Sequence, residues 1–249
     1  MPQIKKTLKT LAAILFWLLL WQIAASAANK DLLIDIPTPV STALSLFCSL
    51  NDSLFYVSVL LSLLRVLAGF LLAFVFGTVF GVLSSRYSLI YTLFSPLLKV
   101  IRAVPVASFI ILVYLWMSRE YVPTFIAFLT VLPIIWTNVY DGINATNKQL
   151  LEMANVMGMK RFDTLKHIIL PGAKPFITSA VSTGLGFAFK SGIAAEVICR
   201  TVNSLGELLW RGKSSVDYNN VFAVTVAVVI LSVALEHGVS FLFKRRAKQ

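Results

Sequence analysis

Four ionisable side chains stand inside long apolar segments of this sequence: Arg65, Lys190, Glu196 and Glu236. A charge in such a segment is costly to bury, so these groups usually serve a function or pair with one another. Lys190 could attract an anion, pair with an acidic group on another helix, or extend its ammonium toward water. Arg65 is expected to be a structural partner. Lys190 and Glu196 would lie about 240° apart around one helix, so they should not face each other.

Residues suited to catalysis or metal binding are sparse. His167 and His237 have no acid–base or metal-ligand partner at a useful spacing. Cys48 and Cys199 are far apart and form no CxxC motif, although a disulfide between them is left open. We therefore predict no metal site, no cofactor bound by this chain and no enzymatic activity. A membrane-embedded lipid-modifying enzyme stays as the alternative from another class.

The composition is that of a membrane protein. Apolar residues make up 58% of the 249 residues and charged residues 13%, whereas soluble domains carry about 25% charged residues. Apolar runs longer than ~18 residues recur, which is typical of membrane-spanning helices. We predict an all-α integral membrane protein with a single transmembrane domain over 1–249 and about six spans. These spans are 9–28, 57–83, 92–116, 121–140, 174–198 and 221–243.

The basic residues predict the orientation of the spans. If the N-terminus is cytoplasmic, most of the 22 basic residues fall in cytoplasmic segments, as the positive-inside rule requires. The cytoplasmic set is Lys5, Lys6, Lys9, Arg86, Lys99, Arg102, Lys148, Lys160, Arg161, Lys166, Lys174, Lys244, Arg245, Arg246 and Lys248, against Lys30, Arg119, Arg200, Arg211 and Lys213 outside. We expect both termini and the segment 141–173 to be cytoplasmic, and the net charge of +11 then gives no indication of nucleic-acid binding.

The N-terminal part of the chain has two interpretations. Three lysines precede the first apolar run, and Ala25-Ser26-Ala27 resembles a signal-peptidase site. Cleavage there would leave five spans, but the run is long for a signal core, so we favour an uncleaved first helix. Residues 29–53 should then lie outside. Val40, Ala43, Leu44 and Phe47 in this segment have the spacing of a short amphipathic helix at the outer surface.

The polar segment LLEMANVMGMKRFDTLKHIILP, residues 150–171, separates the fourth and fifth predicted spans. An apolar stripe at i, i+3, i+4 and i+7 predicts a short amphipathic helix of Leu150, Met153, Ala154 and Met157. Gly158 allows a turn that other residues resist. A second short helix should place Phe162, Leu165 and Ile169 on one side and should be limited by Pro171. Exposed methionines suit an adaptable binding surface, although a hairpin packed on the protein's own spans is also possible.

The spacing E-x-A-x3-G-x9-I-x-L-P in this segment resembles the EAA motif of permease subunits of binding-protein-dependent ABC importers. The matching positions are Glu152, Met153, Ala154, Gly158, Ile168, Leu170 and Pro171. Met153 replaces the family's middle alanine, and its flexible side chain can still fit a groove. Shorter similarities to nitrate/sulfonate/taurine-type permeases extend over about 55–245: Ser62-Leu63-x-Arg65-x3-Gly69-Phe70, Ser95-Pro96, Ile101-Arg102-Ala103-Val104-Pro105, Pro133-Ile134 with Asn138, Gly142 and Ile143, and Ala195-Glu196-Val197 with Leu205-Gly206.

The resemblance implies a type I ABC importer permease-like bundle in a bacterial cytoplasmic membrane. A second permease copy would complete a homodimer, two ATPase subunits would bind ATP and Mg, and an external binding protein would deliver the substrate. The sequence agrees in lacking a G-x4-G-K-[ST] phosphate loop. A passive channel would not need such a docking segment. The substrate would be a small anion such as a sulfonate, taurine or nitrate, with a thiamine pyrimidine precursor or another small solute as the alternative.

The fifth predicted span is rich in small residues, which let helices approach closely or line a cavity. Its small residues include Gly184, Gly186, Ala188, Ser191, Gly192, Ala194 and Ala195. Close packing and a cavity are both compatible with this pattern if the span lies at the dimer interface. The candidates for the translocation path are therefore Lys190, Gly184, Gly192, Glu196 and Arg65.

Overall fold

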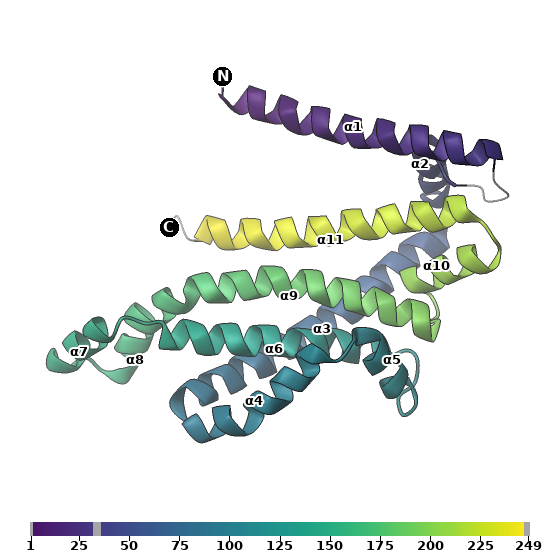
Figure 1. Ribbon diagram of the computed structural model, residues 1–249. Coiled ribbons are helices and arrows are strands. Elements are labelled where there is room, and N and C mark those ends of the chain that lie inside the picture. The colour runs from purple at the N-terminus through teal and green to yellow at the C-terminus, as the bar shows by residue number, and fades with distance from the viewer. Residues whose placement is uncertain (1, 32–35, 247–249) are drawn as a thin grey trace.

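The computed structural model describes residues 2–31 and 36–246, so 32–35 of the predicted outer segment and Lys248 lie outside the described residues. Within them, every regular element is a helix (Figure 1). The helices are α1 (Pro2–Asp31), α2 (Pro39–Ser49), α3 (Ser53–Arg86), α4 (Ser88–Ala103), α5 (Val106–Tyr114), α6 (Val122–Asn144), α7 (Lys148–Val156), α8 (Arg161–Thr164), the π-helical turn η1 (Leu165–Ile169), α9 (Leu170–Cys199), α10 (Leu205–Ser214) and α11 (Tyr218–Arg246). The all-α prediction is confirmed.

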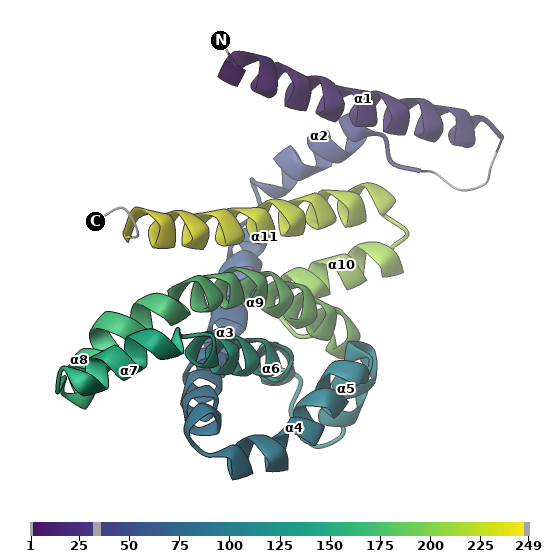
Figure 2. The same cartoon turned by 60° about the vertical axis from the view of Figure 1, so that its left-hand side comes forward.

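The centre of the bundle is α6, which packs along both α3 and α9 (Figure 2). Glycines on α3 make the approach to α6 possible. A Cβ atom on Gly77 would lie 2.8 Å from Cβ of Ile135, and one on Gly81 would lie 2.8 Å from Cβ of Val139. Both distances are shorter than real side chains allow. The small residues therefore determine how closely these two helices approach.

The membrane-spanning helices agree with the predicted spans in four places. In the part of the chain that the structure describes, four helices are long and apolar enough to cross a membrane, over Lys9–Ala28, Ser53–Arg86, Val122–Asn144 and Tyr218–Gly238. The predicted 174–198 corresponds to α9, which has the length of a span but is less apolar, because glycine, serine, threonine and charged residues interrupt it. It lies against α6, α3 and α11, so its less apolar surface is largely covered by protein.

The predicted span over 92–116 is not one continuous helix. The chain there forms α4 and α5, which are bent by 100° from each other. The bend follows from Pro105, which has no N–H to continue the helix and forces the preceding residue out of helical geometry. Val104 accordingly has the extended conformation φ −76°, ψ 132°. The two pieces together are a broken span or a re-entrant segment.

Both described ends of the chain lie at the same end of the bundle as α7 and α8 (Figures 1 and 2). The C-terminal end of α1 and the link between α9 and α10 lie at the opposite end. This is the relative topology expected from the basic residues. The short amphipathic helix predicted after residue 39 is present as α2, and it exposes Val40, Leu44 and Phe47. Cys48 and Cys199 are both free, so the structure does not form the possible disulfide.

Candidate functional site

A hairpin extends beyond the end of the bundle, as Figures 1 and 2 show. It consists of α7, α8 and η1, and we call these residues, 148–169, the hairpin. Its apolar side chains are mostly exposed, including Met153, Val156, Met157 and Phe162. A surface that exposes large apolar groups among charged ones is typical of a contact site for another protein. These exposed side chains do not match the alternative of a hairpin packed against the protein's own spans.

Gly158 ends α7 in a conformation that other residues avoid. Its φ is +68°, in the left-handed region that glycine enters without steric cost. The N–H of Met159 donates to the carbonyl of Ala154 at 2.9 Å, and the N–H of Gly158 donates to the carbonyl of Asn155 at 3.1 Å. This pair of bonds is a Schellman motif. The glycine break predicted from the sequence is confirmed, and the geometry explains the residue type.

The expected end of the second helix at Pro171 is wrong. The backbone stays helical from Arg161 through Pro171 to Cys199, with η1 inserted just before the proline. In this turn the N–H of Leu170 donates to the carbonyl of Leu165, one residue farther back than in an α-helix. Pro171 cannot donate a hydrogen bond and its ring would meet the carbonyl four residues earlier. A wider turn at this point accommodates the ring, so the helical backbone continues from the hairpin into α9.

The motif positions divide into exposed and buried residues. Glu152, Met153, Leu170 and Pro171 are exposed, Gly158 sits at the turn, and Ile168 is half-buried. Ala154 is 1% exposed, so its small side chain points into the hairpin. The motif therefore combines residues available to a partner with residues that give the hairpin its shape.

At the other end of the bundle, Glu196 is buried and joins α9 to α3 and α10. Its Oε2 accepts hydrogen bonds from Ser62 Oγ at 2.7 Å and from the N–H of Gly206 at 3.2 Å. Its Oε1 lies 3.6 Å from Nη1 of Arg65. A buried carboxylate needs this many partners, because its charge is otherwise strongly destabilising. The sequence analysis did not name Ser62 as a candidate site residue, although this serine was part of the resemblance.

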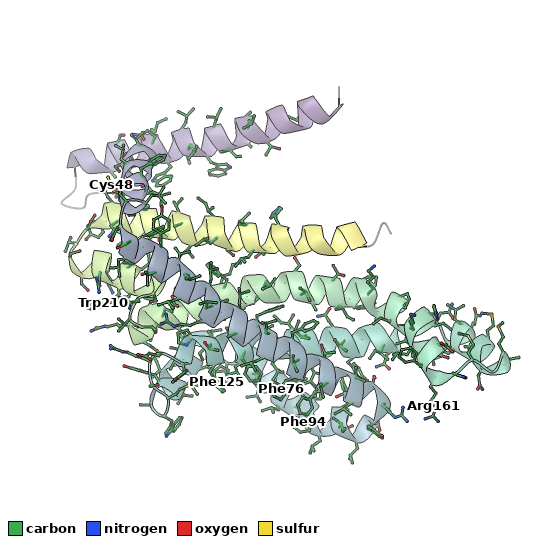
Figure 3. All side chains as sticks on the ribbon, turned by 180° about the vertical axis from the view of Figure 1, so that it is seen from behind. Cys48, Phe76, Phe94, Phe125, Arg161 and Trp210 are labelled. Atoms are coloured by element: carbon green, nitrogen blue, oxygen red, sulfur yellow. The ribbon has the colours of Figure 1, made fainter. Side chains whose placement is uncertain are left out.

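Arg65 also fixes the turn between α9 and α10. Its guanidinium donates to the carbonyls of Val202 at 3.2 Å and Asn203 at 3.5 Å. This turn contains two non-glycine residues with positive φ, Arg200 at 51° and Asn203 at 52°. The guanidinium of Arg200 lies 3.9 Å from the ring centroid of Trp210, a cation–π contact. Trp210 marks this end of the molecule in Figure 3, opposite Arg161 on the hairpin.

Lys190 and Glu236 line one small pocket of about 230 Å³ between α9 and α11. Ser182 and Thr183 contribute hydroxyl groups to the same pocket. A Cβ atom on Gly186 would overlap Oε1 of Glu236, so the glycine makes room for this carboxylate. The sequence analysis identified Glu236 only as a charged residue within a span. Its position in the sequence showed an unusual charge, but only the packing of α11 on α9 shows that it lines a pocket together with Lys190.

The remaining candidates lie in packed contacts. A Cβ atom on Gly184 would lie 3.1 Å from Val131, and one on Gly192 would lie 2.6 Å from Val66. Gly184 therefore allows contact with α6, and Gly192 allows contact with α3. Of the five residues proposed for a translocation path, Lys190 is the one with an exposed side chain.

Comparison with known proteins identifies the family. The family model described as binding-protein-dependent transport system inner membrane component matches residues 67–248. The chain belongs to this family. The match includes the hairpin, the pocket of Lys190 and Glu236, and all of α9. Arg65 and Ser62 lie just before it.

Two transport-system permease proteins are distantly similar to this chain. The riboflavin transport system permease protein of Chloroflexus aurantiacus is 27% identical over 57% of this chain and 53% of its own length. The taurine transport system permease protein of Escherichia coli is 25% identical over 61% of this chain and 55% of its own length. The chain thus matches little more than half the length of these relatives.

The fold of this family member is also found among solved structures. The MetNI methionine ABC transporter, solved in inward-facing conformations, contains a chain similar to this one with a TM-score of 0.64 and 17% identity. The similarity covers 77% of this chain and 95% of that one. The predicted type I importer permease-like bundle is therefore confirmed as the fold.

Proposed function

We propose that this chain is the permease subunit of an ATP-driven ABC importer and that the hairpin couples it to a separate ATPase. The observation that carries the proposal is the hairpin itself. It has the spacing of the EAA motif, extends beyond the bundle, and exposes Met153, Met157 and Phe162. Its continuous helical connection into α9 would transmit movement of the hairpin to the bundle.

The proposed partners follow from this role. Two ATPase subunits would bind ATP and Mg and hydrolyse the nucleotide, so this chain would be a non-catalytic subunit. A second copy of the permease would complete the pathway, and an external binding protein would bind at the end of the bundle that carries α10. The assembly would reside in the bacterial cytoplasmic membrane with both termini in the cytoplasm, as the distribution of basic residues supports.

The coupling proposal is tested by purifying the tagged full-length chain from its native membrane. We expect it to retain an ABC ATPase in stoichiometric amount and to stimulate ATP hydrolysis when substrate and binding protein are present. Deletion of 150–170 should remove the ATPase from the purified material. The proposal is wrong if no ATPase is retained and the deletion leaves transport intact.

For the substrate we propose a small anion, such as a sulfonate, taurine or nitrate. Lys190 favours an anionic substrate because its side chain is exposed and lies in a pocket of the bundle. Glu236 in the same pocket adds a negative group, and taurine carries both an ammonium and a sulfonate. A relative is a taurine permease, but another is a riboflavin permease. A thiamine pyrimidine precursor or another small solute remains the second candidate.

Uptake by variants in the pocket distinguishes these substrates. Lys190→Met should raise the apparent KM for every anion, whereas Glu236→Gln should affect taurine and leave nitrate unchanged. Lys99→Met, which removes an exposed lysine from α4, serves as the control. Unchanged uptake and unchanged affinity in Lys190→Met would exclude a role of the pocket in substrate binding, while coupling to the ATPase could still hold.

A further inference from the structure

Two adjoining clefts lie where the hairpin meets the end of α3. The larger has a volume of about 590 Å³, and the smaller, of about 370 Å³, is lined by α3, α6, η1 and α9. Val82, Arg86, Leu165 and Ile169 line both. The two clefts therefore form one groove, which begins at the hairpin and continues along α3 into the bundle. We call it the hairpin groove.

Two guanidinium groups stand at the mouth of the hairpin groove. Arg86 is the last residue of α3, Arg161 is the first residue of α8, and both side chains are exposed and line the larger cleft. Figure 3 shows Arg161 projecting from the hairpin on the side where α3 ends. Among the residues whose side chains the structure describes, neither forms an ion pair, and the guanidinium of Arg86 lies 5.9 Å from the ring centroid of Tyr87. An anion in the groove would meet two positive charges without displacing a carboxylate.

Most of the remaining wall of the hairpin groove is apolar. Leu151, Met159 and Phe162 line the larger cleft, and Val139 and Ile177 line the smaller one. A small hydrophilic anion would leave these walls uncovered. A ligand with a charged head and an apolar tail would cover both parts.

The position of the groove relative to the membrane identifies the kind of amphiphile. Arg86 ends a helix that is long and apolar enough to cross a membrane, so its guanidinium lies near the boundary between hydrocarbon and water. Tyr87 follows it, and tyrosines are enriched at this level of a bilayer. Phosphate groups of lipids occupy the same level. The smaller cleft reaches Thr78, two helical turns deeper on α3.

We propose that the hairpin groove binds an anionic phospholipid, with its phosphate between Arg86 and Arg161 and one acyl chain along α3 and α9. Basic pockets between helices at a membrane face suit such lipid head groups, and guanidinium groups bind phosphate by paired hydrogen bonds. The two arginines belong to different elements. A bound lipid would therefore hold the hairpin against the C-terminal end of α3, and this role would not depend on the transported substrate.

The test measures lipid retention by the purified full-length chain. Native mass spectrometry in mild detergent is used to titrate phosphatidylglycerol and, separately, the zwitterionic phosphatidylcholine. We expect tight retention of at least one phosphatidylglycerol, with weaker binding of phosphatidylcholine. Arg86→Gln with Arg161→Gln should weaken phosphatidylglycerol binding by roughly tenfold or more, because each basic residue near an anionic lipid contributes to the attraction.

A matched control removes two positive charges from the hairpin and leaves both groove arginines in place. Lys148→Gln with Lys160→Gln changes two exposed lysines that do not line the groove, and it should leave retention unchanged. Ile169→Trp fills the apolar part without changing charge and should also lower retention, with circular dichroism confirming that the helices persist. Equal loss in the arginine and lysine pairs would overturn the proposal. Displacement of the lipid by millimolar inorganic phosphate would instead identify a site for free anions, and equal retention of both lipids would also contradict the proposal.

Discussion

The carboxylate Oε1 of Glu196 lies 3.6 Å from Nη1 of Arg65, at the end of the bundle opposite the hairpin. This contact joins α9 to α3. Arg65 also binds the turn between α9 and α10 at Val202 and Asn203, and Glu196 binds the start of α10 at Gly206. Three helices therefore depend on one pair of residues, of which Glu196 is fully buried and Arg65 is 17% exposed.

Removing one member of this pair should destabilise the protein. For Glu196→Ala we expect a loss of about 3 kcal/mol in unfolding free energy, because the half-buried guanidinium of Arg65 and the buried hydroxyl of Ser62 lose their partner. The change is measured by thermal unfolding in detergent. Arg211→Ala, which breaks the exposed pair with Glu207, should cost about 0.5 kcal/mol. Similar losses in the two variants would contradict a structural role for Glu196.

Gly206 and Gly186 both lie in close helix contacts, but they should differ sharply in how well they tolerate substitution. A Cβ on Gly206 would meet Cβ of Glu196 and the backbone nitrogen of Val197, so Gly206→Ala must separate α10 from α9. We expect it to cost about 1–3 kcal/mol. Gly186→Ala meets only the end of the flexible Glu236 side chain, so its loss of unfolding free energy should be smaller. The comparison fails if Gly186→Ala is the more destabilising variant.

Substitution of Gly158 should weaken coupling with little change in the bundle. Gly158→Ala places a Cβ at φ +68°, a conformation that costs about 1–2 kcal/mol for ordinary residues. The expected result is reduced ATPase binding and transport, with an unfolding temperature close to that of the parent protein. Gly158→Asn should retain more activity because asparagine tolerates this conformation better. Gly238→Ala has open space around its Cβ and should behave like the parent.

Charge reversal at Glu152 tests the hairpin as a contact surface. The side chain is exposed on α7, so Glu152→Lys should leave the helices intact and inserted in the membrane. We expect ATP hydrolysis by the partner to continue while substrate transport stops, as measured together in reconstituted vesicles. Loss of the protein from the membrane would mean that the hairpin serves folding instead of coupling.

The sequence alone determined the elements whose causes are local. Long apolar runs fixed α3, α6 and α11, because a span needs only enough consecutive apolar residues. Gly158 and its spacing from Ala154 predicted the break in the hairpin, since a left-handed turn depends on a few neighbouring residues. The motif of residues 152–171 likewise carried the family resemblance without any knowledge of distant contacts.

The tertiary structure decided the relationships between segments far apart in the chain. The sequence after Ala103 is compatible with one kinked helix or with two separate helices. The structure has two helices, with α4 packed on α6 and α5 packed on α6 and α9. The burial of Glu196 beside Arg65, the pocket of Lys190 and Glu236, and the groove of Arg86 and Arg161 all join separate helices. Hydropathy and spacing along one helix specify which face is polar, but they do not specify which helix lies against it.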